Sequence, residues 1–450
     1  MRGQLKKFIE AMDDNSVAII PAAHEQTRSY DTEFKFRQDS DFWYLTGFPE
    51  PDAIAVITKA NKVNYTLYVR PRDPVMETWF GRRQGVDGAV KNYKAERSYP
   101  IDKFAADLGK ILDGYDKLYY RFALDAALDQ QILGYFRGQR VARIKTAYPP
   151  HTIIDPTPII GEMRLHKSDK EVALMQKAAT IAAEAHILAM KKVRPGMNES
   201  QVESLMEAYM RDQGASGVAY NSIIGGGDNA TILHYVENNM PLKDGDLILI
   251  DAGAEVEGYA SDITRTFPVN GKYTKAQREV YDVVLDVQLK CIDFTVVGNT
   301  HQKRQEYSIE LLTEGMKQLG LLKGKTKDLI KKKAYMKYYM HGVGHWLGLD
   351  VHDAGRYFVD QQAKQSKPYA PGMVLTVEPG LYIPPNDKSA PAKYRGIGIR
   401  IEDDVLVTKD GNLNLTAKVT KDPDEIEALM QKGSVQKPAV QKPARSKGTR

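Results

Sequence analysis

The chain has 450 residues, of which 42% are hydrophobic and 27% charged, a composition typical of a folded globular protein with more than one domain. The formal net charge of +5 is small for this length, and no apolar run approaches the roughly 20 residues of a membrane span, so we expect neither nucleic acid nor a membrane as a partner. The single cysteine, Cys291, excludes an internal disulfide and a zinc–thiolate cluster. The first 15 residues lack the apolar stretch of a signal peptide, and we therefore expect a cytoplasmic location.

The first 165 residues alternate strand and helix patterns, which predicts a compact α/β domain. Strands are expected at Ser16–Pro21, Ala53–Ile57, Val63–Val69 and Leu118–Phe122, with a hairpin between the second and third, and helices at Asp102–Leu112 and Ala123–Phe136. Two polar stretches with aromatic residues, 37–48 and 77–85, are most simply read, taken alone, as turns with core aromatics.

The composition changes at residues 164–171. Ser168 followed by Glu171 is a capping-box pattern, and it predicts an alanine-rich helix that runs to about Val193. Asn198 can cap a further helix that extends through Arg211. A second domain therefore begins near residue 166.

An acidic pair follows the apolar run 247–250, which has the pattern of a buried strand that ends at Asp251. A turn centred between Val256 and Glu257 would pair Asp251 directly with Asp262, whereas a turn at Glu257-Gly258 would make them diagonal neighbours, and in both cases they share one face of a β-hairpin. Like charges placed so closely destabilise a hairpin, so a positive group should lie between them. The alternative is that both aspartates are ordinary solvated hairpin residues.

A weak internal repeat points to two related halves. Residues 245–251 match residues 372–378 in pattern, because each has a glycine, a mostly apolar run and an acid six positions after the glycine, Asp251 or Glu378. A second strand would then carry Asp262 in the first half and Glu402 in the second, with Arg400 on the same face as Glu402.

The stretch HGVGHWLGLDVHD, residues 341–353, holds three of the nine histidines. It is not the HExxH motif of zinc peptidases, because no glutamate lies between His341 and His345 and the glycines disfavour a helix. What remains is a set of four carboxylates, with or without one histidine, that could hold metal ions.

At this point a resemblance emerges. The segments FRQDSDFWYLTGF, ETWFGRRQG, HGVGHWLGLDVHD, VLTVEPGLY and YRGIGIRIEDD resemble those of bacterial Xaa-Pro aminopeptidases (aminopeptidase P) of the pita-bread metallopeptidase family. The resemblance implies an α/β (α+β) protein with a creatinase-type N-terminal domain over residues 1–165 and a pita-bread catalytic domain over 166–431. The basic stretch 432–450, with its QKPA repeat, has the composition of a disordered tail.

The resemblance also implies a metal centre with five ligands: Asp251, Asp262, His345, Glu378 and Glu402. Carboxylates and an imidazole suit hard or intermediate ions, and Mn²⁺ is the ion that we expect. Four acids overcompensate one divalent ion, whereas two such ions balance them and hold a bridging hydroxide that attacks the peptide bond.

Further roles follow from the same resemblance. His234 and His352 would lie beside the metals as catalytic groups that are not ligands, and Glu378 would also move a proton. Arg400 would hold the carboxylate of Glu402 in position by a hydrogen bond, and Tyr382 would serve a similar role. In the substrate pocket we expect His341, Asp41 for the α-ammonium group, and Trp79 for the prolyl end.

The implied activity is release of the first residue from peptides with proline at position 2. Trp79 would reach in from a neighbouring subunit, so we expect a homo-oligomer, a dimer or a tetramer. A prolidase, which accepts only dipeptides, is the alternative enzyme. A pita-bread protein that has lost catalysis and only binds partners is a further alternative.

Overall fold

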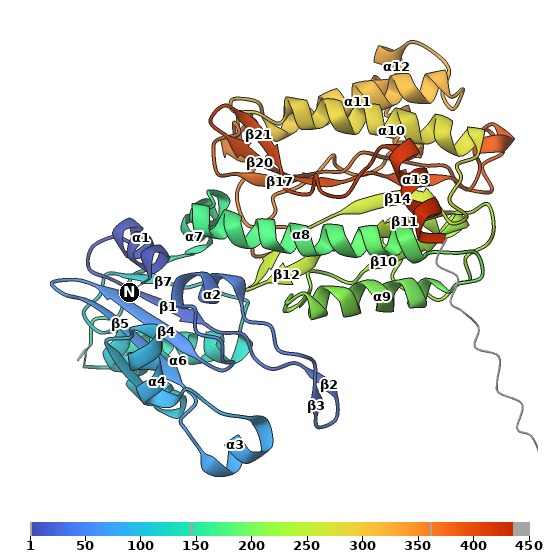
Figure 1. The fold of residues 1–450 in the computed structure, drawn as a ribbon. Coiled ribbons are helices and arrows are strands. Elements are labelled where there is room, and N and C mark those ends of the chain that lie inside the picture. Colours follow the sequence, from blue (N-terminus) through green and yellow to red (C-terminus); the bar gives the residue numbers. More distant parts are fainter. Residues whose placement is uncertain (1, 145–146, 361, 435–450) are drawn as a thin grey trace, which may run out of the picture. The chain divides into compact units, whose positions relative to one another are not determined.

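A computed structural model describes residues 2–144, 147–360 and 362–434 of the chain (Figure 1). The chain divides into two compact units, one from Met1 to Met163 and a second that begins at Arg164. Both units mix helices and strands, which confirms the predicted α/β class. The predicted basic tail falls, from residue 435 on, outside the described residues.

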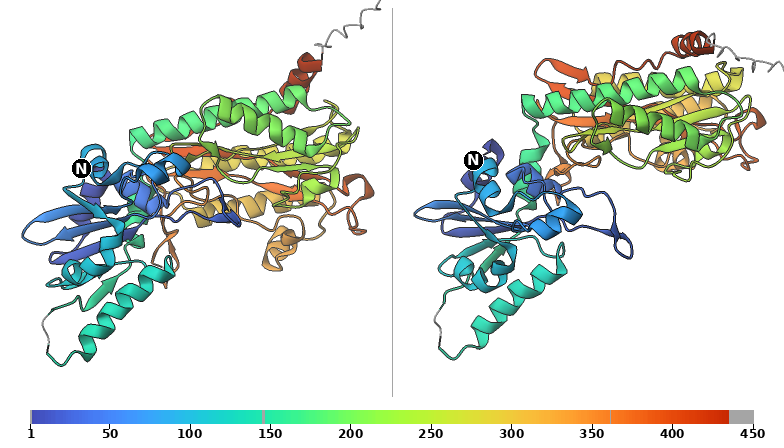
Figure 2. Two further views of the ribbon diagram at one scale, coloured as in Figure 1. Left: turned by 90° about the horizontal axis from the view of Figure 1, so that it is seen from below. Right: turned by 60° about the horizontal axis from the view of Figure 1, so that its bottom comes forward.

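The first unit is built on a six-stranded sheet with the order β6-β5-β4-β1-β7-β8. Its strands are β1 (Ser16–Pro21), β4 (Ile54–Lys59), β5 (Val63–Val69), β6 (Arg97–Pro100), β7 (Lys117–Tyr119) and β8 (Thr152–Ile154). Its helices are α1 (Gly3–Ala11), α2 (Ser40–Thr46), α3 (Pro74–Phe80), α4 (Gly85–Tyr93), α5 (Phe104–Leu112) and α6 (Ala126–Val141), and a small hairpin joins β2 (Thr27–Ser29) to β3 (Thr32–Glu33). Apolar side chains of α5 and α6 pack on one face of the sheet, and Figure 2 shows α6 in teal beneath the strands.

Most of the elements predicted for this unit are present. The expected hairpin is β4–β5, and α6 starts three residues later than predicted because Asp125 caps it by accepting hydrogen bonds from the backbone of Ala127 and Leu128. The prediction for the two aromatic stretches is partly wrong. Both stretches contribute a short helix, α2 and α3, and whereas Phe42 on α2 is buried, Trp79 on α3 is 77% exposed.

The second unit places its strands between two pairs of helices, α8 with α9 and α10 with α11 (Figure 1). The helices are α7 (Thr157–Leu165, at the boundary), α8 (Asp169–Lys192), α9 (Glu199–Asp212), α10 (Lys275–Phe294), α11 (His301–Gln318), α12 (Thr326–Lys331) and α13 (Pro423–Ser434). One large hydrophobic cluster joins these helices to the strands, and the single cysteine, Cys291, is buried in it. The capping box of Ser168 and the cap of Asn198 start α8 and α9 as predicted.

The strands of this unit form several small sheets. Their bounds are β9 (Gly217–Val218), β10 (Ile223–Gly226), β11 (Leu247–Asp251), β12 (Ala254–Val256), β13 (Tyr259–Ala260), β14 (Thr264–Pro268), β15 (Phe358–Asp360), β16 (Gln365–Ser366), β17 (Val374–Val377), β18 (Gly380–Tyr382), β19 (Gly398–Arg400), β20 (Asp403–Thr408) and β21 (Gly411–Asn414). Strand β11 lies between β10 and β14, and β17 pairs with β20, so each half of the predicted repeat supplies one strand that leads to an acid, Asp251 or Glu378.

The register of β11 and β14 decides where the first two acids lie. Asp251 pairs with Thr264, and the chain turns at Glu257-Gly258, where both residues have positive φ. Asp262 is therefore a diagonal neighbour of Asp251 on one face, as predicted from the turn position. Among the described residues, none of the helices is long and apolar enough to cross a membrane.

Candidate active site

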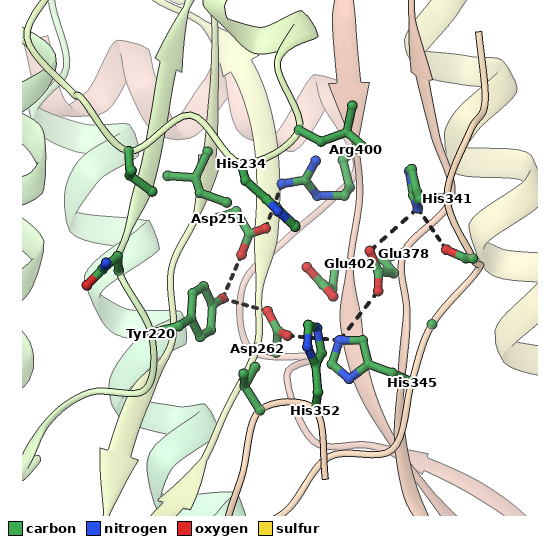
Figure 3. A pocket seen from close by; sticks show the side chains of 17 residues that line it. Tyr220, His234, Asp251, Asp262, His341, His345, His352, Glu378, Arg400 and Glu402 are labelled. Atoms are coloured by element: carbon green, nitrogen blue, oxygen red, sulfur yellow. Dashed lines mark hydrogen bonds and ion pairs between the residues drawn. The ribbon is translucent and has the colours of Figure 1, made fainter. Parts of the chain in front are cut away.

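A cavity of about 440 Å³ opens in the second unit between the strands that carry the four predicted acids (Figure 3). The side chains that line it include Tyr220, His234, Asp251, Asp262, His341, His345, His352, Glu378, Arg400 and Glu402. The structure thus brings all five predicted metal ligands to one place, together with both predicted catalytic histidines.

His345 lies among three of the carboxylates. Its Nε2 is 3.4 Å from Oδ2 of Asp262 and 3.5 Å from Oε1 of Glu378. Ligand atoms of Asp262, His345 and Glu402 all lie within 4.8 Å of one another, a spacing at which one ion could contact all three. On the other side of the ring, Nδ1 is 3.0 Å from the carbonyl oxygen of Trp346, so it carries a proton, and Nε2, which faces the carboxylates, is the nitrogen that would bind a cation.

Tyr220 joins the two aspartates and was not predicted from the sequence. Its hydroxyl oxygen lies 2.6 Å from Oδ1 of Asp251 and 2.5 Å from Oδ1 of Asp262 (Figure 3). The residue stands in an irregular segment after β9. Nothing in that local sequence distinguishes it from an ordinary surface tyrosine.

Arg400 is linked to Glu402 indirectly, through Thr264, whose hydroxyl accepts a hydrogen bond of 3.1 Å from Nε of Arg400, and its part in fixing Glu402 stays a prediction. The guanidinium of Arg400 also donates to Oδ2 of Asp251 at 2.6 Å, and Glu402 accepts a hydrogen bond of 2.6 Å from the hydroxyl of Thr264. Arg400 reaches Asp251 because β19 ends beside β11 and β14, so its side chain crosses to the neighbouring strand. Thr264 was missed as well, although it stands two residues after Asp262 and alternation along an extended chain places both on one face.

Arg400 also begins a chain of hydrogen bonds to His341. Its Nη1 donates to the hydroxyl of Tyr382 at 2.9 Å, and this hydroxyl lies 2.9 Å from Nε2 of His341. Since the Tyr382 oxygen already accepts from Arg400, it donates to Nε2, and the proton of His341 is on Nδ1, 2.7 Å from the carbonyl oxygen of Gly342. Burial lowers the pKa of His341 to about 4, so its ring is neutral at neutral pH.

The remaining two histidines lie at the rim. His352 packs edge to face on His345, with ring centres 4.3 Å apart, and burial lowers its pKa. His234 lines the cavity from the segment after β10 and is exposed. Both can reach a ligand in the cavity while they stay outside the carboxylate cluster.

Three of the four carboxylates of the cavity have too few positively charged neighbours to offset their burial, and their pKa values show it. Burial raises the pKa of Asp251 in spite of Arg400, raises that of Glu378 to about 7, and raises that of Glu402 well above its ordinary value. At Asp262 burial also opposes the charged form, but the hydrogen bonds to His345 and Tyr220 and the positive charges of His345 and Arg400 together outweigh it, and the pKa is lowered. Burial lowers the pKa of His345, but Asp262, Glu378 and the carbonyl group of Trp346 outweigh it and raise that pKa to about 9.

These features fit divalent cations. Three buried acids and the half-buried Glu378, grouped with one arginine and one histidine, form a site whose charge would be balanced by two divalent ions. The donors are oxygens and one imidazole nitrogen, a set that hard and intermediate ions prefer. The ordered tautomer of His345 and the hydrogen bonds from Tyr220 and Thr264 already orient the donor atoms.

Asp41 and Trp79, the two substrate residues predicted in the first domain, belong to the first unit. Asp41 stands in the first turn of α2, and Trp79 stands on α3, a helix without a buried residue. Their roles in substrate binding stay predictions.

Comparison with known proteins decides the family. The model of metallopeptidase family M24 matches residues 173–409, and that of the aminopeptidase P N-terminal domain matches residues 2–119. The chain belongs to metallopeptidase family M24. The M24 match contains all five predicted ligands and both predicted catalytic histidines.

Relatives of this M24 chain extend over nearly its whole length. It is 46% identical to the Xaa-Pro aminopeptidase of Escherichia coli, covering 94% of this chain and 95% of the relative, and 45% identical to that of Haemophilus influenzae, covering 93% and 94%. Human Xaa-Pro aminopeptidase 3 is 36% identical, covering 90% of this chain and 79% of the relative.

Solved structures similar to this chain are also aminopeptidases P. The zinc-substituted E. coli aminopeptidase P in complex with product has a TM-score of 0.93 at 44% identity and covers 96% of this chain and 98% of the other. Pseudomonas aeruginosa aminopeptidase PepP has a TM-score of 0.93 at 42% identity, with the same coverage. The predicted resemblance to aminopeptidase P and the predicted pita-bread fold are confirmed.

Proposed function

We propose that this chain is a Xaa-Pro aminopeptidase, a metallo-hydrolase that removes the first residue from peptides whose second residue is proline. The observation that carries the proposal is the cavity itself, in which three buried carboxylates, the half-buried Glu378 and the ring of His345 face one another. The likeness to Xaa-Pro aminopeptidases over 94% of the chain supports it.

Two divalent ions would be held by Asp251, Asp262, His345, Glu378 and Glu402, with Mn²⁺ as the ion that we expect from this donor set. When bound, such ions polarise the scissile carbonyl group and lower the pKa of a water molecule, which makes hydrolysis possible at neutral pH.

The protein's own groups would then position the peptide and move protons. His352 and His234 lie at the rim of the cavity, where they can donate hydrogen bonds to the carbonyl oxygen of the substrate and pass a proton to the leaving prolyl nitrogen. Glu378, the proton carrier that the family resemblance implies, lines the cavity 3.5 Å from Nε2 of His345, where it can pass a proton to and from a bound ligand. Arg400 donates a hydrogen bond to Asp251 and, through Tyr382, holds the ring of His341 toward the substrate.

We further propose that the active protein is a homo-oligomer. Helix α3 exposes Val75, Trp79 and Phe80 by 66%, 77% and 68%, and none of its seven residues is buried. Apolar side chains gathered on so short a helix suit contact with a second copy of the chain. In this arrangement Trp79 would offer its indole to the proline ring of a substrate, and Asp41 would receive the α-ammonium group. The cytoplasmic location stays a prediction from the sequence.

The cavity favours longer peptides over the dipeptides of a prolidase. Among the described residues that line it, Arg400 is the only arginine or lysine, and its guanidinium is already bound to Asp251, Tyr382 and Thr264. No other lining cation of that kind is present to bind the carboxylate of a prolyl dipeptide.

The test is to incubate the Mn²⁺-loaded protein with Xaa-Pro, Xaa-Pro-Yaa and longer peptides and to identify the products by mass spectrometry. We expect release of the first residue, with kcat/KM for the tripeptide at least equal to that for the dipeptide. Turnover of dipeptides alone would establish a prolidase. No turnover of any peptide by protein that holds its metal would establish a binding protein.

A further inference from the structure

Five side chains, of which Arg304, Trp346 and Tyr369 are buried and His301 and Tyr357 half-buried, form a closed ring that includes the first turn of α11, and none of them lines the catalytic cavity. The guanidinium carbon of Arg304 lies 5.7 Å from the ring centre of Tyr369, which is 6.0 Å from that of Trp346. Trp346 stacks on Tyr357 at 5.1 Å, and Tyr357 lies 4.6 Å from His301. Since His301 and Arg304 are one helical turn apart, the ring returns to its start. We call these residues the Arg304 ring.

Arg304 carries a buried charge without a counter-charge. Its side chain is fully buried, and Nη1 donates a hydrogen bond of 3.3 Å to the hydroxyl of Thr295. Its Nε and Nη2 have no hydrogen-bond partner, and no carboxylate among the described residues forms an ion pair with it. A buried ion of this kind is strongly destabilising unless something compensates it.

The neighbouring titratable groups do not supply that compensation. Burial raises the pKa of the Tyr369 hydroxyl to about 12 and that of the Cys291 thiol to about 12, so both are neutral at neutral pH. Burial, followed by the charge of Arg304, lowers the pKa of His301 to about 3, which leaves that ring neutral as well. One net positive charge therefore stands among neutral side chains.

The ring also holds further polar atoms without partners. The indole Nε1 of Trp346, the hydroxyl of Tyr369 and Nδ1 of His301 are buried and make no hydrogen bond within the described protein. Together with the two free nitrogens of Arg304, this is a set rich in N–H and O–H donors. Unsatisfied buried polar atoms on adjacent side chains are a signature of a bound ion or water.

We propose that the Arg304 ring binds one small monovalent anion, with chloride as the natural occupant. A halide carries the single negative charge that one guanidinium requires, and it accepts several hydrogen bonds without a preferred direction. A phosphate would bring excess negative charge into an aromatic environment, and a water molecule would satisfy donors without balancing the charge.

The site adjoins the catalytic segment. A Cβ atom built on Gly344 would lie 2.8 Å from Nη2 of Arg304 and 1.9 Å from the carbonyl oxygen of Thr376, so only glycine lets the guanidinium pack against this backbone. Gly344 directly precedes His345, and Trp346 of the ring directly follows it. The bound anion fixes the guanidinium behind the backbone that presents His345.

The test is crystallographic and thermal, on the full metal-loaded chain. Crystals grown in sodium bromide should show an anomalous bromine peak beside Nε or Nη2 of Arg304. In solution, the melting temperature should be higher in chloride than in gluconate of equal ionic strength by about 2 °C or more. This difference should vanish in Arg304→Met and persist in Lys303→Met, which removes an exposed charge from the same helix.

Density without an anomalous signal at the ring would show water in place of an anion and would overturn the proposal. Equal melting temperatures of the wild-type protein in chloride and gluconate would overturn it as well. If Arg304→Met does not fold, the bromide crystals of the wild-type protein and its melting temperatures in chloride and gluconate still decide whether an anion binds. Tyr369→Phe, which removes one donor, should then reduce the difference between the two salts.

Discussion

The hydroxyl oxygen of Tyr220 lies 2.5 Å from Oδ1 of Asp262, and the same oxygen lies 2.6 Å from Oδ1 of Asp251. One neutral side chain thus holds two acids that would otherwise repel each other. It leaves the second oxygen of Asp262 facing His345. Tyr220 therefore orients two of the proposed metal ligands, Asp251 and Asp262, before any ion binds.

Loss of this hydroxyl should weaken metal binding. We expect Tyr220→Phe to lower the affinity for Mn²⁺ by about 10-fold to 100-fold, the usual effect of removing a hydrogen-bond partner of a ligand. Calorimetric titration of the metal-free protein measures it. Tyr209→Phe, which removes a hydroxyl that contacts Glu184 away from the cavity, is the matched control. Wild-type affinity in Tyr220→Phe would contradict the proposed role.

Asp262 should be essential for the metal centre. Asp262→Asn keeps the shape of the side chain but removes a negative charge from the middle of the cluster, so we expect metal and peptidase activity to be lost together. Elemental analysis of wild-type protein purified with Mn²⁺ should give about two ions per chain. A fully active Asp262→Asn enzyme would exclude the two-metal proposal.

His352 should act on the substrate without holding a metal. We expect His352→Ala to retain both ions and to lower kcat by about 10²-fold or more, because a group that transfers a proton is removed. Metal content and steady-state kinetics are measured on the same sample. His151→Ala, at an exposed histidine of the first unit, should change neither. Loss of an ion from His352→Ala would make this residue a ligand.

Asp353 should make the second unit sensitive to acid. Its carboxylate is buried and accepts hydrogen bonds from Arg164 at 2.6 Å and Lys167 at 2.9 Å. Burial opposes the charged form, but these two cations outweigh it and hold the pKa below 3.8. A lowered pKa means that the stabilisation is complete above the unfolded pKa of about 3.9 and is lost as the pH falls through the folded value.

For metal-free protein we therefore expect the free energy of unfolding to fall steeply below about pH 4. Asp353→Asn should be less stable at pH 7 by about 3–5 kcal/mol, since it leaves two buried cations without this partner, and its stability should depend less on acid. Urea denaturation from pH 3 to 7 gives both results. Asp282→Asn, which breaks an exposed pair with Arg278, should cost under about 1 kcal/mol. Equal acid sensitivity of the wild type and Asp353→Asn would refute the assignment.

The sequence by itself determined the elements whose signals are local. The buried run before Asp251 and the turn at Glu257-Gly258 were enough to place Asp251 and Asp262 on one face, because alternation in a strand and the geometry of a tight turn act over a few residues. The caps at Ser168 and Asn198 fixed the starts of α8 and α9 for the same reason.

Only the tertiary structure decided which groups meet across the chain. Arg400 ends β19 and Glu402 lies in the link to β20, yet Arg400 donates to Asp251, 149 residues away, since a long side chain bonds to whichever strand lies beside its own. Tyr220 reaches the aspartates from an irregular segment, and Arg304 on α11 contacts Tyr369 and lies beside Gly344, which both stand outside helices. Such contacts depend on how distant elements pack, and no local pattern of residues encodes them.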